Sequence, residues 1–205
     1  MTAGDLWNTP VTLTGKVVRL EPMSAAHVAG LIEAGRDESI WKYMLYGDLS
    51  MPENMSAWVE ELLAKQAAGT DLPFVVVHLA SGRVAGATRY LDMRPPHRSL
   101  ELGGTWYGVE FQRTAVNTEC KYLLLSYAFE TLGCIRVQFK ADARNERSLR
   151  AIERLGAVRE GLLRNHYIMP DGTFRDSAYF SILDREWPGV KRRLEERLRG
   201  MIDLL

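Results

Sequence analysis

The residues whose types and spacing best suit chemistry lie in one segment, WYGVEFQRTAVNTECK, which runs from Trp106 to Lys121. Its pattern predicts a strand that passes through a short loop into a helix. The first turn of a helix has backbone N–H groups without partners inside the helix, and the helix dipole adds positive charge there. We therefore expect this junction to bind phosphate. The alternative is an ordinary strand-to-helix turn capped by Thr114 or Asn117.

A second polar group follows about thirty residues later, in ADARNERSLRAIERLGA. Its spacing predicts another helix, with Asn145 as the N-cap, Ser148 in the first turn and Gly156 as the stop. Basic side chains surround this start. They are Arg144, Arg147, Arg150 and Arg154.

An acidic side chain lies on the strand that leads into the phosphate-binding loop. Glu101 alternates with Leu100 and Leu102, so its side chain is expected to face a cleft while its neighbours face the core. Gly103 and Gly104 come next, and paired glycines inside a strand favour a bulge or a close backbone approach. A flexible glycine pair in a half-buried strand is the alternative.

The elements that must position these residues can be predicted from hydrophobic periodicity. In the first half, a strand over 16–21 precedes a helix capped by Ser24, and a short helix over 38–44 is expected to expose Trp41, Tyr43 and Tyr46. Pro52 begins a third helix. Three strands then form an antiparallel meander. Their sequences are LPFVVVHLA, RVAGATRYL and SLELGGTWYG.

In the second half, a helix is predicted over 117–132 and the strand CIRVQFK follows it. After the helix that Asn145 caps, a strand pair turns at 170–172, and a basic amphipathic helix starts near Glu186. This order predicts an α+β fold with a mixed sheet. No internal repeat or linker interrupts the pattern, so 1–205 is expected to be one domain.

Taken together, these features resemble the GNAT superfamily of acetyl-CoA-dependent N-acetyltransferases over nearly the whole chain. The opening GKVVRLEPM, the helix start N145-x-x-S148 with AIERLGA, and the later EGLLRNHY and GTFRDSAYFSIL are similar to its ribosomal-protein amino-terminal acetyltransferase branch. The resemblance implies a three-layer α/β/α fold. Its central, mostly antiparallel sheet would be splayed between strands 4 and 5.

In that family a [QR]-x-x-G-x-[GA] loop holds the pyrophosphate of coenzyme A, and an Asn on the next helix contacts the pantetheine arm. Gln112 matches the first loop position, whereas Ala115 and Asn117 replace the usual glycines. The resemblance implies acetyl-CoA as cosubstrate. The expected cofactor-binding residues are Trp106, Tyr107, Gln112, Arg113, Thr114, Ala115, Val116, Asn117, Thr118, Asn145 and Ser148.

Acetyl transfer to an amine needs a neutral nucleophile, a polarised thioester carbonyl and a proton for the thiolate, and positioning supplies much of the rate. Glu101 is the candidate general base, acting through water; the alternative is a solvated carboxylate or a structural ion pair. A backbone amide near Trp106 or Tyr107 is expected to stabilise the thioester oxygen. Position 152, where other branches place a tyrosine acid, is Ile152, so Ser148 is the candidate proton donor. A Ser148 bonded to local backbone is the alternative.

Composition excludes several other classes of protein. The 26 basic and 26 acidic residues balance, which argues against a nucleic-acid binder, and 46% hydrophobic residues argue against disorder. No apolar run is long enough to span a membrane, and no secretory signal is visible. Cys120 and Cys134 are expected to be core residues in a cytoplasmic protein, and the four scattered histidines predict no metal site.

The predicted partner is a primary amine, either a small molecule or a protein amino terminus, with no nucleic acid or membrane, and the chain is expected to be a monomer or homodimer. Trp41, Tyr43, Tyr46 and Tyr90 would line an acceptor pocket or belong to the core. The competing function is a non-catalytic acyl-CoA-binding sensor or scaffold with the same fold. A dinucleotide-binding domain is disfavoured, because no G-x-G-x-x-G follows an early strand.

Overall fold

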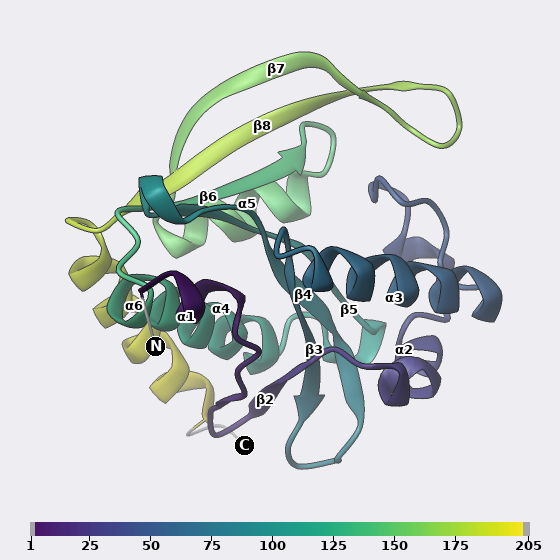
Figure 1. The fold of residues 1–205 in the computed structure, drawn as a ribbon, viewed down its shortest axis with the longest axis horizontal. Coiled ribbons are helices and arrows are strands. Elements are labelled where there is room, and N and C mark those ends of the chain that lie inside the picture. Colours follow the sequence, from purple (N-terminus) through teal and green to yellow (C-terminus); the bar gives the residue numbers. More distant parts are fainter. Residues whose placement is uncertain (1–2, 203–205) are drawn as a thin grey trace.

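The computed structural model describes residues 3–202, and a mixed eight-stranded sheet forms its centre (Figure 1). The strand order is β1-β2-β3-β4-β5-β6-β8-β7, and every neighbouring pair is antiparallel except β5 and β6. The strands are β1 (Leu13–Thr14), β2 (Val18–Pro22), β3 (Leu72–His78), β4 (Val84–Arg94), β5 (Ser99–Tyr107), β6 (Arg136–Asp142), β7 (Val158–Ile168) and β8 (Phe174–Leu183).

Helices cover both faces of the sheet, so the fold has three layers (Figure 1). The larger core cluster lies under α4, α5 and α6, and the smaller cluster lies under α2 and α3. The α-helices are α1 (Ala3–Asn8), α2 (Val28–Ala34), α3 (Pro52–Ala67), α4 (Ala115–Ser126), α5 (Glu146–Leu155) and α6 (Trp187–Ile202). A π-helical turn over Tyr127–Thr131 extends α4.

The sheet opens between β5 and β6. These parallel strands pair only from Ser99 to Glu101 and from Arg136 to Gln138, although β5 continues to Tyr107. The predicted splay between strands 4 and 5 is therefore found here, one number higher because the short β1 precedes the strand that was predicted first. The gap opens towards the start of α4.

A bulge sits where the glycine pair predicts it. Arg89 lies opposite Gly103, but Ala87 lies opposite Trp106, so β5 carries one extra residue. Gly104 has a φ of +58°, a left-handed conformation that glycine adopts at low cost. The bulge bends the strand just before the loop that leads into α4.

The segment that follows α2 differs from its prediction. Only a 3-10 turn forms, over Glu38–Ile40, and Trp41 is 3% exposed rather than on the surface. The indole Nε1 of Trp41 donates to the Gly35 carbonyl at 2.9 Å, and its ring packs into the smaller core cluster. Burial of this large ring outweighs the helical pattern of the segment.

A buried carboxylate ties the amino-terminal segment to α4. Glu119 is 4% exposed and accepts the backbone N–H groups of Lys16, Val17 and Val18 at 2.9, 2.6 and 2.7 Å. A Cβ added at Gly15 would lie 2.3 Å from the Glu119 carboxyl carbon, so only glycine fits there. These bonds fix the start of β2 against the central helix.

Candidate functional site

The start of α4 lies closer to the loop than the pattern predicts, with Thr114 as the N-cap and Ala115 as the first helical residue. The Thr114 hydroxyl accepts the Val116 N–H at 3.3 Å and donates to the Phe111 carbonyl at 2.7 Å. Thr114 is therefore the cap, but it occupies only one of the first-turn N–H groups. The N–H groups of Ala115 and Asn117 belong to the same turn, where an anion is stabilised.

The two substitutions of glycine in the loop cause no backbone strain. Ala115 and Asn117 are helical, and neither has a positive φ. The residue with left-handed backbone is Arg113, at a φ of +62°. A non-glycine residue there costs about 1–2 kcal/mol. The tight turn thus falls one residue before the cap.

Side-chain bonds hold the loop in place. Gln112 Nε2 donates to the Tyr107 carbonyl at 3.0 Å, and Arg147 Nη1 donates to Gln112 Oε1 at 2.5 Å. Arg147 lies in the first turn of α5, so Gln112 connects the loop to the second helix start. The two predicted helix starts are therefore brought together.

The backbone amide of Tyr107 faces the gap between β5 and β6. Gly108 N–H donates to the Ala85 carbonyl on β4, and Gly86 lies opposite Tyr107. In an antiparallel pair, alternate residues direct their N–H and C=O groups to opposite sides. The N–H of Tyr107 therefore points away from β4, whereas the N–H of Trp106 points towards it. Of the two predicted oxyanion donors, the geometry favours Tyr107.

Glu101 lies at the last residue pair before the gap, and it has two side-chain partners. Gln138 Nε2 donates to its Oε2 at 2.9 Å, and Lys140 Nζ lies 3.4 Å from its Oε1. Burial works to lower the pKa of Lys140, but Glu101 and the Tyr167 hydroxyl reverse this and raise it. The carboxylate, 4% exposed as a residue, thus faces a charged lysine.

Asn145 and Ser148 begin α5 as predicted. The side-chain oxygen of Asn145 accepts the Ser148 N–H at 3.1 Å, which makes Asn145 the N-cap. The amide nitrogen of Asn145 takes no part in that bond. Ile152, where a tyrosine acid was missing, is 8% exposed and belongs to the larger core cluster.

Several of the expected cofactor-binding side chains, that of the buried Tyr107 among them, point elsewhere. Val116 is 1% exposed, so only its backbone faces the loop. The Thr118 hydroxyl contacts Met201 Sδ on α6 at 3.8 Å. Trp106 belongs to the smaller core cluster, on the sheet face away from α4. Only the backbones of these residues remain candidates for contact with a cofactor.

A buried lysine near the gap was missed by the sequence analysis. Lys121 is 7% exposed, and its Nζ donates to the Thr105 hydroxyl at 2.9 Å, which in turn is 2.8 Å from the Thr88 hydroxyl. Burial lowers the pKa of Lys121 to about 8. A signal existed in the sequence, because Lys121 lies three residues from Thr118 and from Leu124 and so shares their helix face.

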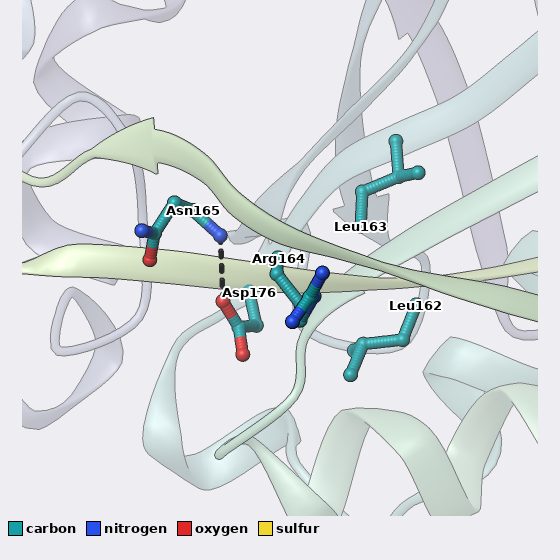
Figure 2. A pocket seen from close by; sticks show the side chains of 5 residues that line it. All are labelled: Leu162, Leu163, Arg164, Asn165 and Asp176. Carbon is teal, nitrogen blue, oxygen red and sulfur yellow. Dashed lines mark hydrogen bonds between the residues drawn. The ribbon is translucent and has the colours of Figure 1, made fainter.

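A hollow lies on the exposed β7–β8 hairpin (Figure 2). Asn165, with a φ of +46°, donates its backbone N–H to Asp176 at 2.7 Å across the two strands. None of the residues that carry the predicted chemistry lines it. Its lining residues are Leu162, Leu163, Arg164, Asn165 and Asp176.

No helix among residues 3–202 has the length and hydropathy of a membrane span. Among the side chains that the structure describes, no three from His, Cys, Asp or Glu gather as metal ligands would.

The fold and the helix starts around the gap define an acetyltransferase-type architecture, and comparison with known proteins agrees. The family model for the acetyltransferase (GNAT) domain matches residues 18–158. The chain therefore belongs to the GNAT acetyltransferase family.

Individual relatives point to one branch of that family. The chain is 29% identical over 174 residues to a Bacillus subtilis (strain 168) protein named "Putative ribosomal N-acetyltransferase YdaF", covering 84% of this chain and 92% of that protein. A structure from T. thermophilus described as a "putative acetyltransferase" is 41% identical, with a TM-score of 0.84, over 93% of this chain and 98% of that one. RimJ from Mycobacterium smegmatis shares the fold, with 21% identity and a TM-score of 0.79 over 95% and 97% of the two chains. The resemblance to the ribosomal-protein acetyltransferase branch is confirmed.

Proposed function

We propose that this protein, as one domain over 1–205, transfers the acetyl group of acetyl-CoA to a primary amine by direct attack in a ternary complex. The observation that carries the proposal is the gap between β5 and β6, which has the Tyr107 amide on one side and the start of α4 at its mouth. The RimJ structure is described as a complex with CoA-disulfide, and the name of YdaF specifies a ribosomal acetyltransferase. These names support a CoA thioester as donor and a protein amino terminus or a small-molecule amine as acceptor.

The residues present fit coenzyme A. The free first-turn amides of Ala115 and Asn117, with the exposed Arg113, would hold the pyrophosphate. Asn145 lies at the start of α5, which Arg147 and Gln112 join to the loop, so its amide group would contact the pantetheine arm. When bound, acetyl-CoA supplies the activated acetyl group.

In the proposed reaction the amine nitrogen forms a bond to the thioester carbonyl carbon, and the carbon–sulfur bond breaks. The Tyr107 N–H would donate to the carbonyl oxygen as negative charge develops on it. Glu101 would take the first ammonium proton through water before the attack. The Ser148 hydroxyl would donate to the departing thiolate and regain its proton from the amine nitrogen, which loses its second proton as the amide forms. Because Lys140 and Gln138 hold Glu101 in one orientation, the carboxylate is positioned at the edge of the gap.

The binding test uses acetyl-CoA titrations followed by calorimetry and thermal unfolding. A ligand at 100 times its Kd stabilises the folded state by about 2.7 kcal/mol, so a clear rise in Tm is expected. Ala115→Asp is expected to weaken binding, but Ala115 is 6% exposed, so a new charge there also threatens the fold. Asn117→Asp is cleaner, because it is isosteric and an acid in the first turn of a helix is favourable without ligand.

We expect Asn117→Asp to lower acetyl-CoA affinity about tenfold or more while the unliganded Tm stays the same or rises slightly. Ala64→Asp, which adds the same charge on the exposed face of α3, is the matched control and should bind as the wild type does. Unchanged affinity in Asn117→Asp would place the pyrophosphate elsewhere.

In a second candidate function, the protein binds acetyl-CoA but does not catalyse acetyl transfer. A sensor or scaffold would bind acetyl-CoA with a Kd unaffected by amines and release no thiol in a panel of amines, which distinguishes it from the enzyme.

We also propose that the protein acts in the cytoplasm, which is supported by its two buried free thiols. The oligomeric state, a monomer or a homodimer, stays a prediction.

A further inference from the structure

Three buried polar atoms without hydrogen-bond partners lie in one aromatic cluster. They are Tyr46 Oη, Trp58 Nε1 and Trp106 Nε1. The ring centroids of Tyr46 and Trp58 are 5.3 Å apart, and those of Trp58 and Trp106 are 6.2 Å apart. We call these three residues the donor pocket. The neighbouring Trp41 differs, because its indole N–H is satisfied by Gly35.

The donor pocket lies beside the proposed reaction centre. Trp106 directly precedes Tyr107 and follows the bulge at Gly103 and Gly104, and its side chain is on the face of the sheet away from α4. Tyr46 and Trp58, but not Trp106, also line an open cavity of about 380 Å³ between α3 and the loop before it. An acceptor that enters from this face would meet the donor pocket next to the thioester.

All three groups can donate a hydrogen bond, and two of them can only donate. An indole N–H has no acceptor capacity. Burial raises the pKa of Tyr46, so its hydroxyl stays protonated. Trp58 and Trp106 are 4% and 3% exposed, so bulk water does not reach these nitrogens. A buried donor without a partner destabilises the fold, and a ligand with acceptor atoms would remove that cost.

The charges nearby favour an anion over a neutral acceptor. Arg175, 5% exposed, donates to the Ser177 hydroxyl and to the Tyr43 carbonyl, but no carboxylate of the described residues is within ion-pair distance of it. Arg89 is 3.3 Å from Asp71, which balances its charge. Both arginines act on Tyr46 electrostatically. Arg175 is therefore a buried cation without an ion-pair partner among the described residues, although Asp142 and Glu101 act on it from a distance.

The acidic groups that line the cavity lie at its outer wall. Asp48 and Glu61 line it and are exposed, and Glu61 is paired with Lys65 on the surface of α3. Solvent screens them, in contrast to the buried donors.

The geometry points to recognition of a carboxylate: we propose that the donor pocket, with Arg175 beside it, binds an acceptor amine that carries a carboxylate group. A carboxylate has about four acceptor positions on two oxygens, whereas a neutral carbonyl has two, so the carboxylate better matches three donors and a cation. This inference rests on the proposed acetyl transfer and narrows its acceptor class to amino acids and similar acidic amines.

The test compares three matched probes for each natural α-amino acid: the free acid, its amide and the decarboxylated amine. Rates of thiol release are measured with acetyl-CoA and corrected for the fraction of neutral amine, and binding is followed by tryptophan fluorescence in the presence of CoA. At least one free acid is expected to bind saturably and to exceed its amide and its decarboxylated amine at least tenfold in kcat/KM. The amino acid amides serve as models of a protein amino terminus, in which the carboxyl group is likewise part of an amide.

Trp58→Phe and Tyr46→Phe keep aromatic rings in place and remove the donors, so each is expected to reduce that preference about tenfold. Trp187→Phe is the matched control, since it removes a buried indole N–H that donates to Glu130 on the α6 side. This control should keep the preference. Reaction of amides or simple amines as fast as the acids, or no saturable binding by any acid, would overturn the inference. Failure of acetyl-CoA itself to bind would instead contradict the proposed function.

Discussion

At the scale of single residues, the site contains buried ionisable groups that are held in different ways. Glu101 has an ion-pair partner in Lys140 and a hydrogen-bond donor in Gln138, whereas Lys121 has the neutral hydroxyl of Thr105 as its hydrogen-bond partner. Removing one partner of a buried ion pair destabilises the fold, because the other charge is left buried without compensation. A buried charge that has no ion-pair partner already lowers the stability of the folded state. The two groups should therefore respond differently to substitution.

Glu101→Gln is expected to lower the acetylation rate about 100-fold, mainly at low pH, where the amine still carries a proton that a base must remove. At high pH the amine is already neutral, so the effect should shrink. A pH–rate profile measures this. Lys140→Met is the comparison, because it removes the ion pair and keeps the carboxylate. If Glu101 only supports the structure, both variants will lose stability and neither profile will change shape.

Lys121→Met is expected to raise the free energy of unfolding at pH 7. The pKa of Lys121 is lowered to about 8 in the folded protein, against about 10.4 in the unfolded chain. Between these two values the unfolded chain binds more protons, so wild-type stability rises with pH over that window. The variant lacks this rise, and its advantage of about 1–3 kcal/mol at pH 7 should shrink by pH 10. Urea unfolding at both pH values tests this, and parallel pH dependences would contradict it.

At the scale of elements, α4 is held at two points along its first half. Its first turn is fixed by Thr114 and by the loop, and Glu119, one turn later, is bonded to the chain before β2. Any displacement of α4 would break these backbone bonds. The helix start that is proposed to hold the pyrophosphate is thus positioned by residues about a hundred positions away.

Glu119→Gln is expected to destabilise the fold by about 1–3 kcal/mol, because one amide oxygen replaces two carboxylate oxygens that accept three N–H groups. Chemical denaturation measures this loss. Glu196→Gln, on the exposed face of α6, should stay within about 0.5 kcal/mol of the wild type. A loss in Glu119→Gln no larger than in this control would show that the buried bonds contribute little.

The accuracy of the sequence predictions also depends on the element. The meander, α3, α5 and the β7–β8 pair follow from local periodicity and turn residues in the sequence. The segment around Trp41 does not follow, since packing against Trp106, 65 positions away, decides its conformation. The contacts of Glu119 with Val17 and of Glu101 with Lys140 likewise join distant parts of the chain. Local pattern carries no signal for them.

At the scale of the whole molecule, the sheet consists of two parts, β1 to β5 and β6 to β8, and within the described chain only three residue pairs of strand register link β5 to β6. The second part ends in β7, the edge strand of the sheet (Figure 1), and most residues of this strand are exposed. Elements with few buried contacts open at lower free energy than the rest of a fold.

This division has a consequence for native-state hydrogen exchange. We expect amides of β7 to exchange through a partial opening, while amides of β8, β3 and β4, whose strands supply buried core residues, exchange only through global unfolding. Exchange measured at increasing urea concentration would separate the two groups; a single group would show that β7 unfolds with the rest of the sheet. Because acetyl-CoA in the gap would contact both halves of the sheet, the cofactor would act as the missing strand pairing between them, and its binding should slow exchange through global unfolding.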